Sequence, residues 1–206
     1  MADDREALVV IDVQNDFCSD GALEVPDGDA VVEVINELIQ TFPRRVFTQD
    51  WHPAAHQSFA SSHPGTSAFD VIEVSYGPQV LWPDHCVQGT PGAEFHRDLA
   101  VDGAELIIRK GFRLEIDSYS AFFENDRTTP TGLAGYLRER GIDSLYLAGL
   151  ATDFCVAYSA VDAAHAGFRV TVIEDACRAI DMDDSLARAW NEMHAAGVSR
   201  SLMAAL

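Results

Sequence analysis

Short apolar runs that recur along the chain are the feature that most restricts its fold. Runs of four or five residues without polar alternation are typical of parallel strands that are buried on both faces. Two of the runs are apolar throughout, two more have an apolar centre, and the fifth has one threonine between apolar residues. The predicted strands are Ala7–Ile11, Arg45–Thr48, Glu105–Arg109, Leu145–Ala148 and Arg169–Ile173.

Segments with helical periodicity lie between these runs. In Ala30–Gln40, for example, apolar residues recur at the spacing of one helix face. The alternation of strands and helices predicts an α/β fold with a mostly parallel central sheet. With 206 residues, 48% of them hydrophobic, the chain can bury the core of one domain, expected to span residues 1–206. The predicted helices are Ala30–Gln40, Thr131–Arg140, Ala157–Ala166 and Ser185–Ala196.

The acidic balance of the chain argues against several classes of partner. Asp and Glu number 33 against 14 Lys and Arg, which gives a formal net charge of −19. Such a surface repels nucleic acid and anionic membranes, and no apolar run reaches the roughly 20 residues of a spanning helix. Lys110 is the only lysine. An acidic, lysine-poor chain fits a cell interior of high salt, and it also fits compositional drift in a GC-rich genome.

The four cysteines show no disulfide or zinc-ribbon pattern. They lie far apart in the sequence, and no two of them form a CxxC pair. Widely separated free cysteines are typical of a reducing compartment, so a cytoplasmic protein is expected. The cysteines are Cys18, Cys86, Cys155 and Cys177.

Reactive side chains follow three of the predicted strands. Asp12, Lys110 and Cys155 each stand just past a strand end, and the carboxyl ends of parallel strands meet at one edge of a sheet. Thr152 and Asp153 are good helix N-caps, so Cys155 is expected in a first helical turn, where N–H groups lower a thiol pKa. This setting favours a nucleophile; a buried structural cysteine and a turn-capping aspartate remain the alternatives.

Histidines gather in one part of the chain, since five of the seven lie between positions 52 and 96. Asp50 and His52 are two residues apart on extended backbone, so both side chains can face the same way, and His56 and His85 follow. Aspartate and imidazole suit zinc, iron or manganese, although scattered loop histidines are more often simply solvated. The long irregular segment Gly65–Glu94 is typical of a functional loop.

Seven motifs spread over the chain are Val10–Phe17, Thr48–Pro53, Trp82–Ala93, Ile108–Gly111, Asp117–Phe122, Gly149–Val156 and Asp175–Arg178. Together they resemble the nicotinamidase branch of the isochorismatase-like cysteine hydrolase superfamily, in register over almost the whole chain. Two departures stand out. Cys18–Gly21 replaces a common Pro-Gly-Gly turn, and the divergent Gly65–Gln79 obscures any fourth protein ligand to a metal.

The resemblance implies a three-layer α/β/α isochorismatase-like hydrolase fold, and hydrolysis of nicotinamide to nicotinate and ammonia in NAD salvage. In that chemistry Cys155 forms a thioester, Asp12 moves the proton, and Lys110 stabilises their charged forms. The backbone N–H groups of Ala151 and Cys155 would form the oxyanion hole. A cis peptide would join Leu150 to Ala151.

The resemblance also implies one divalent metal ion, zinc in the first place and iron or manganese as alternatives, that ligates the pyridine nitrogen. His56 is a weaker candidate for a further ligand, and Ser58 for a contact through water. The implied metal ligands are Asp50, His52 and His85. The side chains implied to pack around the ring are Phe17, Trp82 and Tyr119.

The implied partner is the small molecule nicotinamide, not nucleic acid or a membrane, and the resemblance is compatible with a homo-oligomer. Two alternatives stay open. The chain could be a different amide or carbamoyl hydrolase, which needs no pyridine-binding metal, so metal content distinguishes it. It could also be an inactive metal- or ligand-binding protein on a flavodoxin-like sheet. The intact Asp12, Lys110 and Cys155 argue against the second alternative, and ammonia release tests it.

Overall fold

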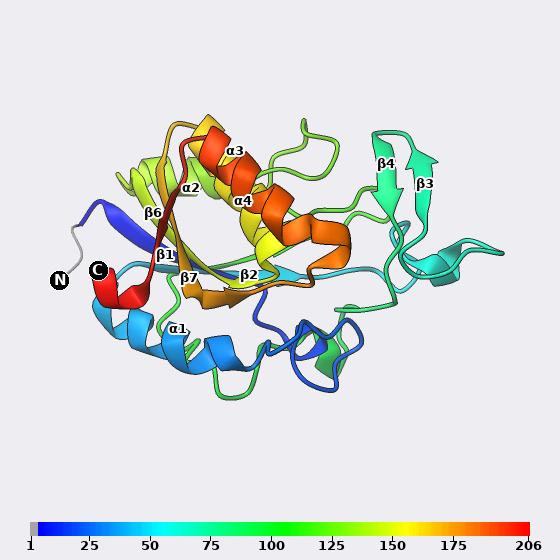
Figure 1. The fold of residues 1–206 in the computed structure, drawn as a ribbon, viewed down its shortest axis with the longest axis horizontal. Helices are drawn as coiled ribbons and strands as arrows, with labels where there is room; N and C mark the ends of the chain where they lie inside the picture. Colours follow the sequence, from blue (N-terminus) through cyan, green and yellow to red (C-terminus); the bar gives the residue numbers. More distant parts are fainter. Residues whose placement is uncertain (1–3) are drawn as a thin grey trace.

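The computed structural model describes residues 4–206 and contains a central sheet of six strands (Figure 1). The strand order is β5-β2-β1-β6-β7-β8, and every neighbouring pair is parallel. The predicted parallel sheet is therefore confirmed. Its strands are β1 (Glu6–Ile11), β2 (Arg45–Asp50), β5 (Leu106–Lys110), β6 (Ser144–Leu150), β7 (Arg169–Arg178) and β8 (Ser199–Ser201).

Helices cover both faces of the sheet and give the expected three layers, with α1 on one face and α2, α3 and α4 on the other (Figure 1). Alternate residues of β1 reach opposite cores. Val9 packs in the cluster that contains Leu137 of α2, and Val10 packs in the cluster that contains Ile35 of α1. Each such buried aliphatic side chain contributes roughly 1.5–3 kcal/mol by leaving water. The helices are α1 (Ala30–Thr41), α2 (Leu133–Glu139), α3 (Ala157–His165) and α4 (Ser185–Ala195).

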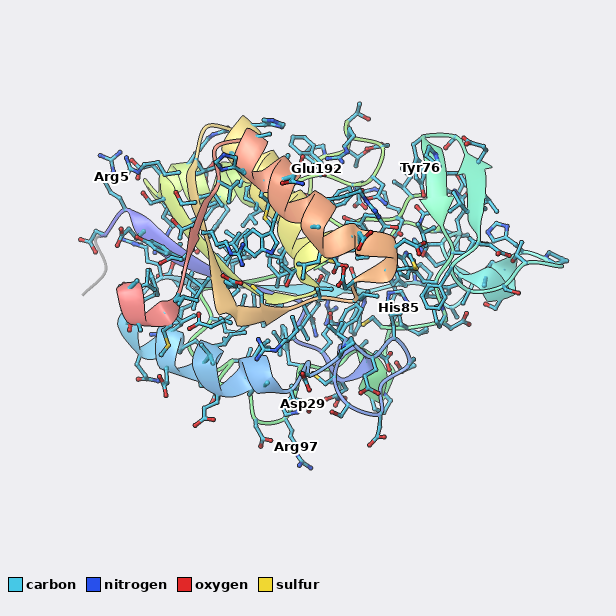
Figure 2. All side chains as sticks on the ribbon, viewed as in Figure 1. Arg5, Asp29, Tyr76, His85, Arg97 and Glu192 are labelled. Carbon is cyan, nitrogen blue, oxygen red and sulfur yellow. The ribbon has the colours of Figure 1, made fainter. Side chains whose placement is uncertain are left out.

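Parts of the fold differ from the sequence predictions. The segment expected to be irregular contains an antiparallel hairpin, β3 (Val71–Val74) and β4 (Gly77–Val80), that projects away from the sheet (Figure 1). Tyr76 lies in its turn (Figure 2). β8 is a polar strand at the edge of the sheet, so its sequence has no apolar run from which a strand could be predicted. Short 3-10 turns span Asn15–Phe17, Ala60–Ser62, Pro91–Ala93, Met182–Asp184 and Met203–Ala205.

The carboxyl ends of β1, β2, β5 and β6 meet at the edge where the reactive residues were predicted. Asp50 and Lys110 are the last residues of β2 and β5 and lie opposite each other in register. Ile11 pairs with Gly149, whose φ is +127°, and a Cβ there would lie 2.0 Å from the Ile11 carbonyl oxygen. Only glycine therefore lets β1 and β6 approach this closely. Among the helices of residues 4–206, none is long and apolar enough to cross a membrane.

Candidate active site

A fully buried lysine connects the residues predicted at the strand ends. The Nζ of Lys110 lies 2.8 Å from Oδ2 of Asp12 and 3.4 Å from Sγ of Cys155. It also donates to the carbonyl oxygen of Ser118 over 2.9 Å and pairs with Oδ1 of Asp50. The structure thus brings Asp12, Lys110 and Cys155 together and adds Asp50 to the group.

The charges in this group support one another despite their burial. Burial alone would lower the pKa of Lys110, but Asp12 and Asp50 raise it well above its ordinary value, so the ammonium is retained. Burial raises the pKa of Asp12, which Lys110 opposes and Asp50 reinforces. The hydroxyl of Thr48 donates to Oδ1 of Asp12 over 2.5 Å. Asp12 is therefore a carboxylate with increased proton affinity, as a general base requires.

Cys155 lies in a π-helical turn, Thr152–Val156, between β6 and α3. The prediction that Cys155 lies in the first turn of a helix is confirmed, since this turn follows β6 and leads directly into α3. The predicted capping by side chains is wrong, because the turn begins without a side-chain capping bond. The carboxylate of Asp153 instead accepts hydrogen bonds from the backbone N–H groups of Ile180 (3.1 Å) and Asp181 (2.8 Å). π-Helical turns of this kind are found frequently at functional sites.

The thiol of Cys155 has a raised pKa. Burial raises it well above its ordinary value; Lys110 opposes this, and Asp12 and Asp50 add to it. The prediction that a helix start lowers this pKa is therefore wrong, because burial beside two carboxylates outweighs the nearby N–H dipoles. A thiolate forms here only when a neighbouring base takes the proton.

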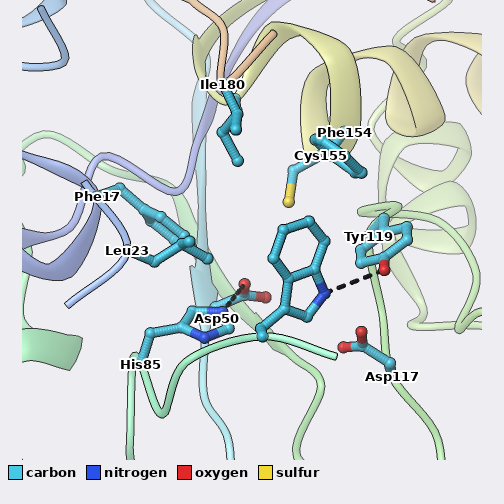
Figure 3. Close-up of a pocket in the computed structure, with 11 residues that line it drawn as sticks. Phe17, Leu23, Asp50, His85, Asp117, Tyr119, Phe154, Cys155 and Ile180 are labelled. Atoms are coloured by element: carbon cyan, nitrogen blue, oxygen red, sulfur yellow. Dashed lines mark hydrogen bonds and ion pairs between the residues drawn. The ribbon is translucent and has the colours of Figure 1, made fainter. Parts of the chain in front are cut away.

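The thiol of Cys155 points into a small cavity (Figure 3). All three side chains expected around the ring line it, with Phe17 and Tyr119 on opposite sides in Figure 3. The indole N–H of Trp82 donates to the Tyr119 hydroxyl over 3.1 Å. The predicted cis peptide between Leu150 and Ala151 is present, and Ala151 also lines the cavity.

Sequence reasoning gave no role to four other residues that line the cavity. Two of them, Asp117 and Phe154, stand inside the motifs quoted above, and that position is the signal that could have found them. Leu23 and Ile180 come from loops whose sequence gives no such signal. Their place in the cavity depends on how distant segments pack.

Three predicted metal ligands also lie at this edge of the sheet. Oδ2 of Asp50 is 3.6 Å from Nε2 of His52 and 3.8 Å from Nε2 of His85, and all three side chains are buried. Burial would raise the pKa of Asp50, but Lys110 and His52 lower it well below its ordinary value. Asp50 and His52 therefore face the same way, as predicted, and Asp50 is an anion.

Hydrogen bonds on the far side of both rings determine which nitrogen is free. Nδ1 of His52 lies 2.9 Å from the Gly111 carbonyl oxygen, and Nδ1 of His85 lies 2.8 Å from that of Pro83. A carbonyl oxygen only accepts, so this network assigns the proton to each Nδ1, and each neutral ring directs an Nε2 lone pair towards Asp50. Burial would lower the pKa of His52, yet the Asp50 anion raises it. A cation bound at Nε2 would take the place of the proton that this anion favours. This buried donor set fits a divalent cation such as zinc.

His56 is less suited to hold a metal. Its Nδ1 lies 2.7 Å from the hydroxyl of Ser58, and its Nε2 lies 2.9 Å from the Arg113 carbonyl oxygen. Ligand atoms of His52, His56 and Asp117 also lie within 4.8 Å of one another. However, the Nε2–H of His56 donates to the carbonyl and its Nδ1 accepts from the hydroxyl, so the ring has no lone pair to spare.

The arrangement joins two kinds of chemistry at one cavity. A thiol beside a carboxylate base and a fixed ammonium can act as a nucleophile that takes up and then releases an acyl group. The aspartate and two imidazoles beside them can hold a cation. Asp50 belongs to both groups, since one of its oxygens pairs with Lys110 and the other faces the histidines.

Comparisons with known proteins agree on one family. A family model described as the isochorismatase domain matches residues 6–201. A nicotinamidase of Acinetobacter baylyi is 59% identical over 194 residues, which cover 94% of this chain and 91% of that protein. The solved structure of an Acinetobacter baumanii nicotinamidase pyrazinamidase has a TM-score of 0.98 and 55% identity, covering 100% of this chain and 99% of that one. A Pyrococcus horikoshii pyrazinamidase in complex with zinc has a TM-score of 0.77 and 38% identity, covering 96% and 99% of the two chains.

Proposed function

Since the chain belongs to the isochorismatase family and, within it, to the nicotinamidases, we propose that it hydrolyses nicotinamide to nicotinate and ammonia through a thioester on Cys155. The observation that carries this proposal is the Lys110 ammonium, which contacts Asp12, Asp50 and Cys155 beside one cavity. We propose further that residues 1–206 work as one domain, since the family model spans 6–201.

The reaction begins when Cys155 adds to the carboxamide and forms a tetrahedral adduct. Cys155 gives its proton to Asp12 as its sulfur attacks the carboxamide carbon, and the carbonyl oxygen takes the electron pair. Because burial raises the pKa of the thiol, the transfer needs a base in contact with it, and Asp12 has the required proton affinity. Lys110 keeps its charge throughout and stabilises whichever partner is anionic.

Collapse of this tetrahedral adduct gives the thioester, and hydrolysis of the thioester then completes the reaction. The backbone N–H groups of Ala151 and Cys155 hold the oxyanion, a contact typically worth roughly 3–4 kcal/mol of barrier for each donor. Asp12 returns its proton to the amine as the C–N bond breaks and ammonia leaves. Water then attacks the thioester while Asp12 takes its proton, the C–S bond breaks, and the proton returns to Cys155 as nicotinate forms.

The cavity is proposed to orient the ring as well as the amide. Phe17, Trp82 and Tyr119 pack around it, and Asp50, His52 and His85 hold one divalent ion, zinc in the first place and iron or manganese as alternatives. That ion would bind the pyridine nitrogen and withdraw electron density from the ring. The donor set of this chain and the zinc of the Pyrococcus horikoshii relative support this assignment. Ser58 remains a candidate for a contact through water, and its hydroxyl is bonded to Nδ1 of His56.

Ammonia release from nicotinamide and from benzamide, with and without a chelator, tests the proposal. Nicotinamide should be hydrolysed, benzamide far more slowly because it lacks the ring nitrogen, and the chelator should remove the difference. No ammonia from nicotinamide with metal-loaded protein would overturn the activity. Equal rates on both amides, or no effect of the chelator, would overturn the role of the metal.

A further inference from the structure

We propose that Gln14 is a positioning residue that sets the place of Asp50, the carboxylate shared by Lys110 and the metal ligands; its importance for catalysis rests on the function proposed above. The side-chain carboxamide of Gln14 is completely buried. Its Oε1 accepts from the backbone N–H of Asp50 over 2.8 Å, and its Nε2 donates to the Asp50 carbonyl oxygen over 2.9 Å. The same Nε2 also donates to the Ala93 carbonyl oxygen over 2.9 Å.

This paired contact replaces backbone that has left the sheet. β1 and β2 pair up to Val10 and Phe47, and Asp12 then turns the chain away with a φ of +48°. No β1 residue beyond Val10 is paired with β2 in the part of the chain that the structure describes. The amide of Gln14 offers Asp50 the same donor and acceptor that a strand residue would offer. On its other side Asp50 pairs with Lys110 of β5.

Only a carboxamide of this length satisfies the three partners. A glutamine has one oxygen and an NH₂ group with two protons, and all of them are used: the oxygen once and both protons. The orientation of the amide is fixed because the Asp50 N–H must donate and the two carbonyl oxygens must accept. Replacing this amide with an apolar side chain would leave the buried N–H and C=O groups of Asp50 without these hydrogen bonds.

The position of Asp50 matters more than that of an ordinary strand residue. Its Oδ1 pairs with Lys110, and its Oδ2 faces Nε2 of His52 and of His85. A small shift of its backbone therefore changes the metal site and the surroundings of Lys110 together. Gln14 would thus control metal retention from a position that makes no contact with the metal.

Gln49 provides a matched control in the same layer. It is also buried, and its Nε2 donates to the same Ala93 carbonyl oxygen over 3.1 Å. Its Oε1, however, accepts from Arg109 Nε over 3.3 Å. Replacing Gln49 therefore removes a buried glutamine and the Ala93 contact without removing the paired contact to the backbone of Asp50.

The experiment compares Gln14→Met with Gln49→Met, each close to glutamine in size. Zinc affinity is measured by competition with a chromophoric chelator, and thermal unfolding is measured without metal. We expect Gln14→Met to weaken zinc binding roughly 10- to 100-fold, as loss of a supporting contact to a metal ligand typically does, and Gln49→Met to change it less than about twofold. Gln14→Met should lose more thermal stability than Gln49→Met, because it gives up two hydrogen bonds to the Asp50 backbone besides the Ala93 contact.

Gln14→Asn keeps the amide, but its side chain is one methylene too short to reach both the N–H and the C=O of Asp50. It is the variant to measure if Gln14→Met does not fold. It should also weaken zinc binding. Equal zinc affinity in the Gln14 and Gln49 variants, or no folding of either Gln14 variant, would overturn the positioning role. If the variants differ in zinc affinity as expected but the parent protein does not hydrolyse nicotinamide, the proposed function fails and the inference about Asp50 stands.

Discussion

Two groups of side chains in this molecule look alike as metal sites, yet their hydrogen bonds differ. In each, three ligand atoms lie within 4.8 Å of one another. The sheet-edge cluster is Asp50, His52 and His85, and the surface cluster is Cys18, Asp29 and His96. In the sheet-edge cluster, both histidines donate Nδ1–H to a carbonyl oxygen and leave Nε2 without a proton. In the surface cluster, the histidine accepts a backbone N–H at Nδ1.

In the surface cluster, hydrogen bonds already occupy the atoms of His96 and Asp29 that could bind a metal. Nδ1 of His96 accepts the backbone N–H of Asp98 over 3.2 Å, so its Nε2 carries the proton that faces Asp29 at 3.2 Å. Asp29 also accepts from the backbone N–H of Ser19 over 2.8 Å. Burial, with a contribution from Asp29, raises the pKa of Cys18 to about 12. Proximity of ligand atoms is therefore a weak criterion; the partner of the far histidine nitrogen decides whether a lone pair is available.

The largest expected difference concerns two cysteines, Cys155 beside Asp12 and Asp50 and Cys18 of the surface cluster. Cys155→Ser should reduce turnover of nicotinamide by more than roughly 10⁴-fold with the fold intact, because a hydroxyl is a far poorer nucleophile than a thiolate. Cys18→Ser should stay within a few-fold of the parent, since no lysine contacts it. Ammonia release and circular dichroism check both. Near-normal turnover in Cys155→Ser would show that Cys155 is structural.

The next effect concerns Lys110, whose ammonium contacts Cys155 and has no counterpart beside Cys18. Lys110→Arg should lose at least about 100-fold in kcat/KM although it conserves charge. The compact ammonium contacts two carboxylates, a carbonyl and the thiol at once, whereas a planar guanidinium is broader and tends to pair with one carboxylate as a fork. Arg109→Lys, one position away, is the control and should change kcat/KM only a few-fold. Folded Lys110→Arg with activity close to the parent would show that charge alone suffices.

A smaller effect separates the two clusters directly. His52→Ala should weaken zinc binding and raise KM for nicotinamide, because it removes one of three ligands from the sheet-edge cluster. His96→Ala should leave the zinc stoichiometry unchanged, since the surface cluster offers no free histidine lone pair. Isothermal titration with zinc checks both. Loss of one bound zinc in His96→Ala would contradict the comparison.

The same physics explains how much the sequence revealed. Asp12, Lys110 and Cys155 follow apolar runs, so a parallel sheet had to bring them to one edge, and the structure does so. Gln14 stands in a quoted motif, but its partner Asp50 is distant in sequence and the contact exists only after β1 leaves the sheet. The direction of the thiol pKa shift is not predicted correctly, because the burial of Cys155 and its two carboxylate neighbours cannot be read from one segment.

The smallest expected effect concerns the stability that the surface cluster supplies. Hydrogen bonds from Ser19 lower the pKa of Asp29 below its ordinary value of 3.8, with a further contribution from His96. A depressed carboxyl pKa adds stability that is fully present above the unfolded value and is lost as the pH falls through the lower, folded value.

Asp29→Asn should therefore unfold at a lower temperature than the parent at pH 6, and this gap in unfolding temperature should narrow towards pH 3. Because the Asp29 side chain is 41% exposed, the gap should be small. Asp98→Asn, whose side chain is 67% exposed, is the control for the loss of one surface carboxylate. A gap that stays constant from pH 6 to pH 3 would mean that Asp29 acts as a neutral acceptor, and zinc-dependent stabilisation lost only in Asp29→Asn would restore the surface cluster as a metal site.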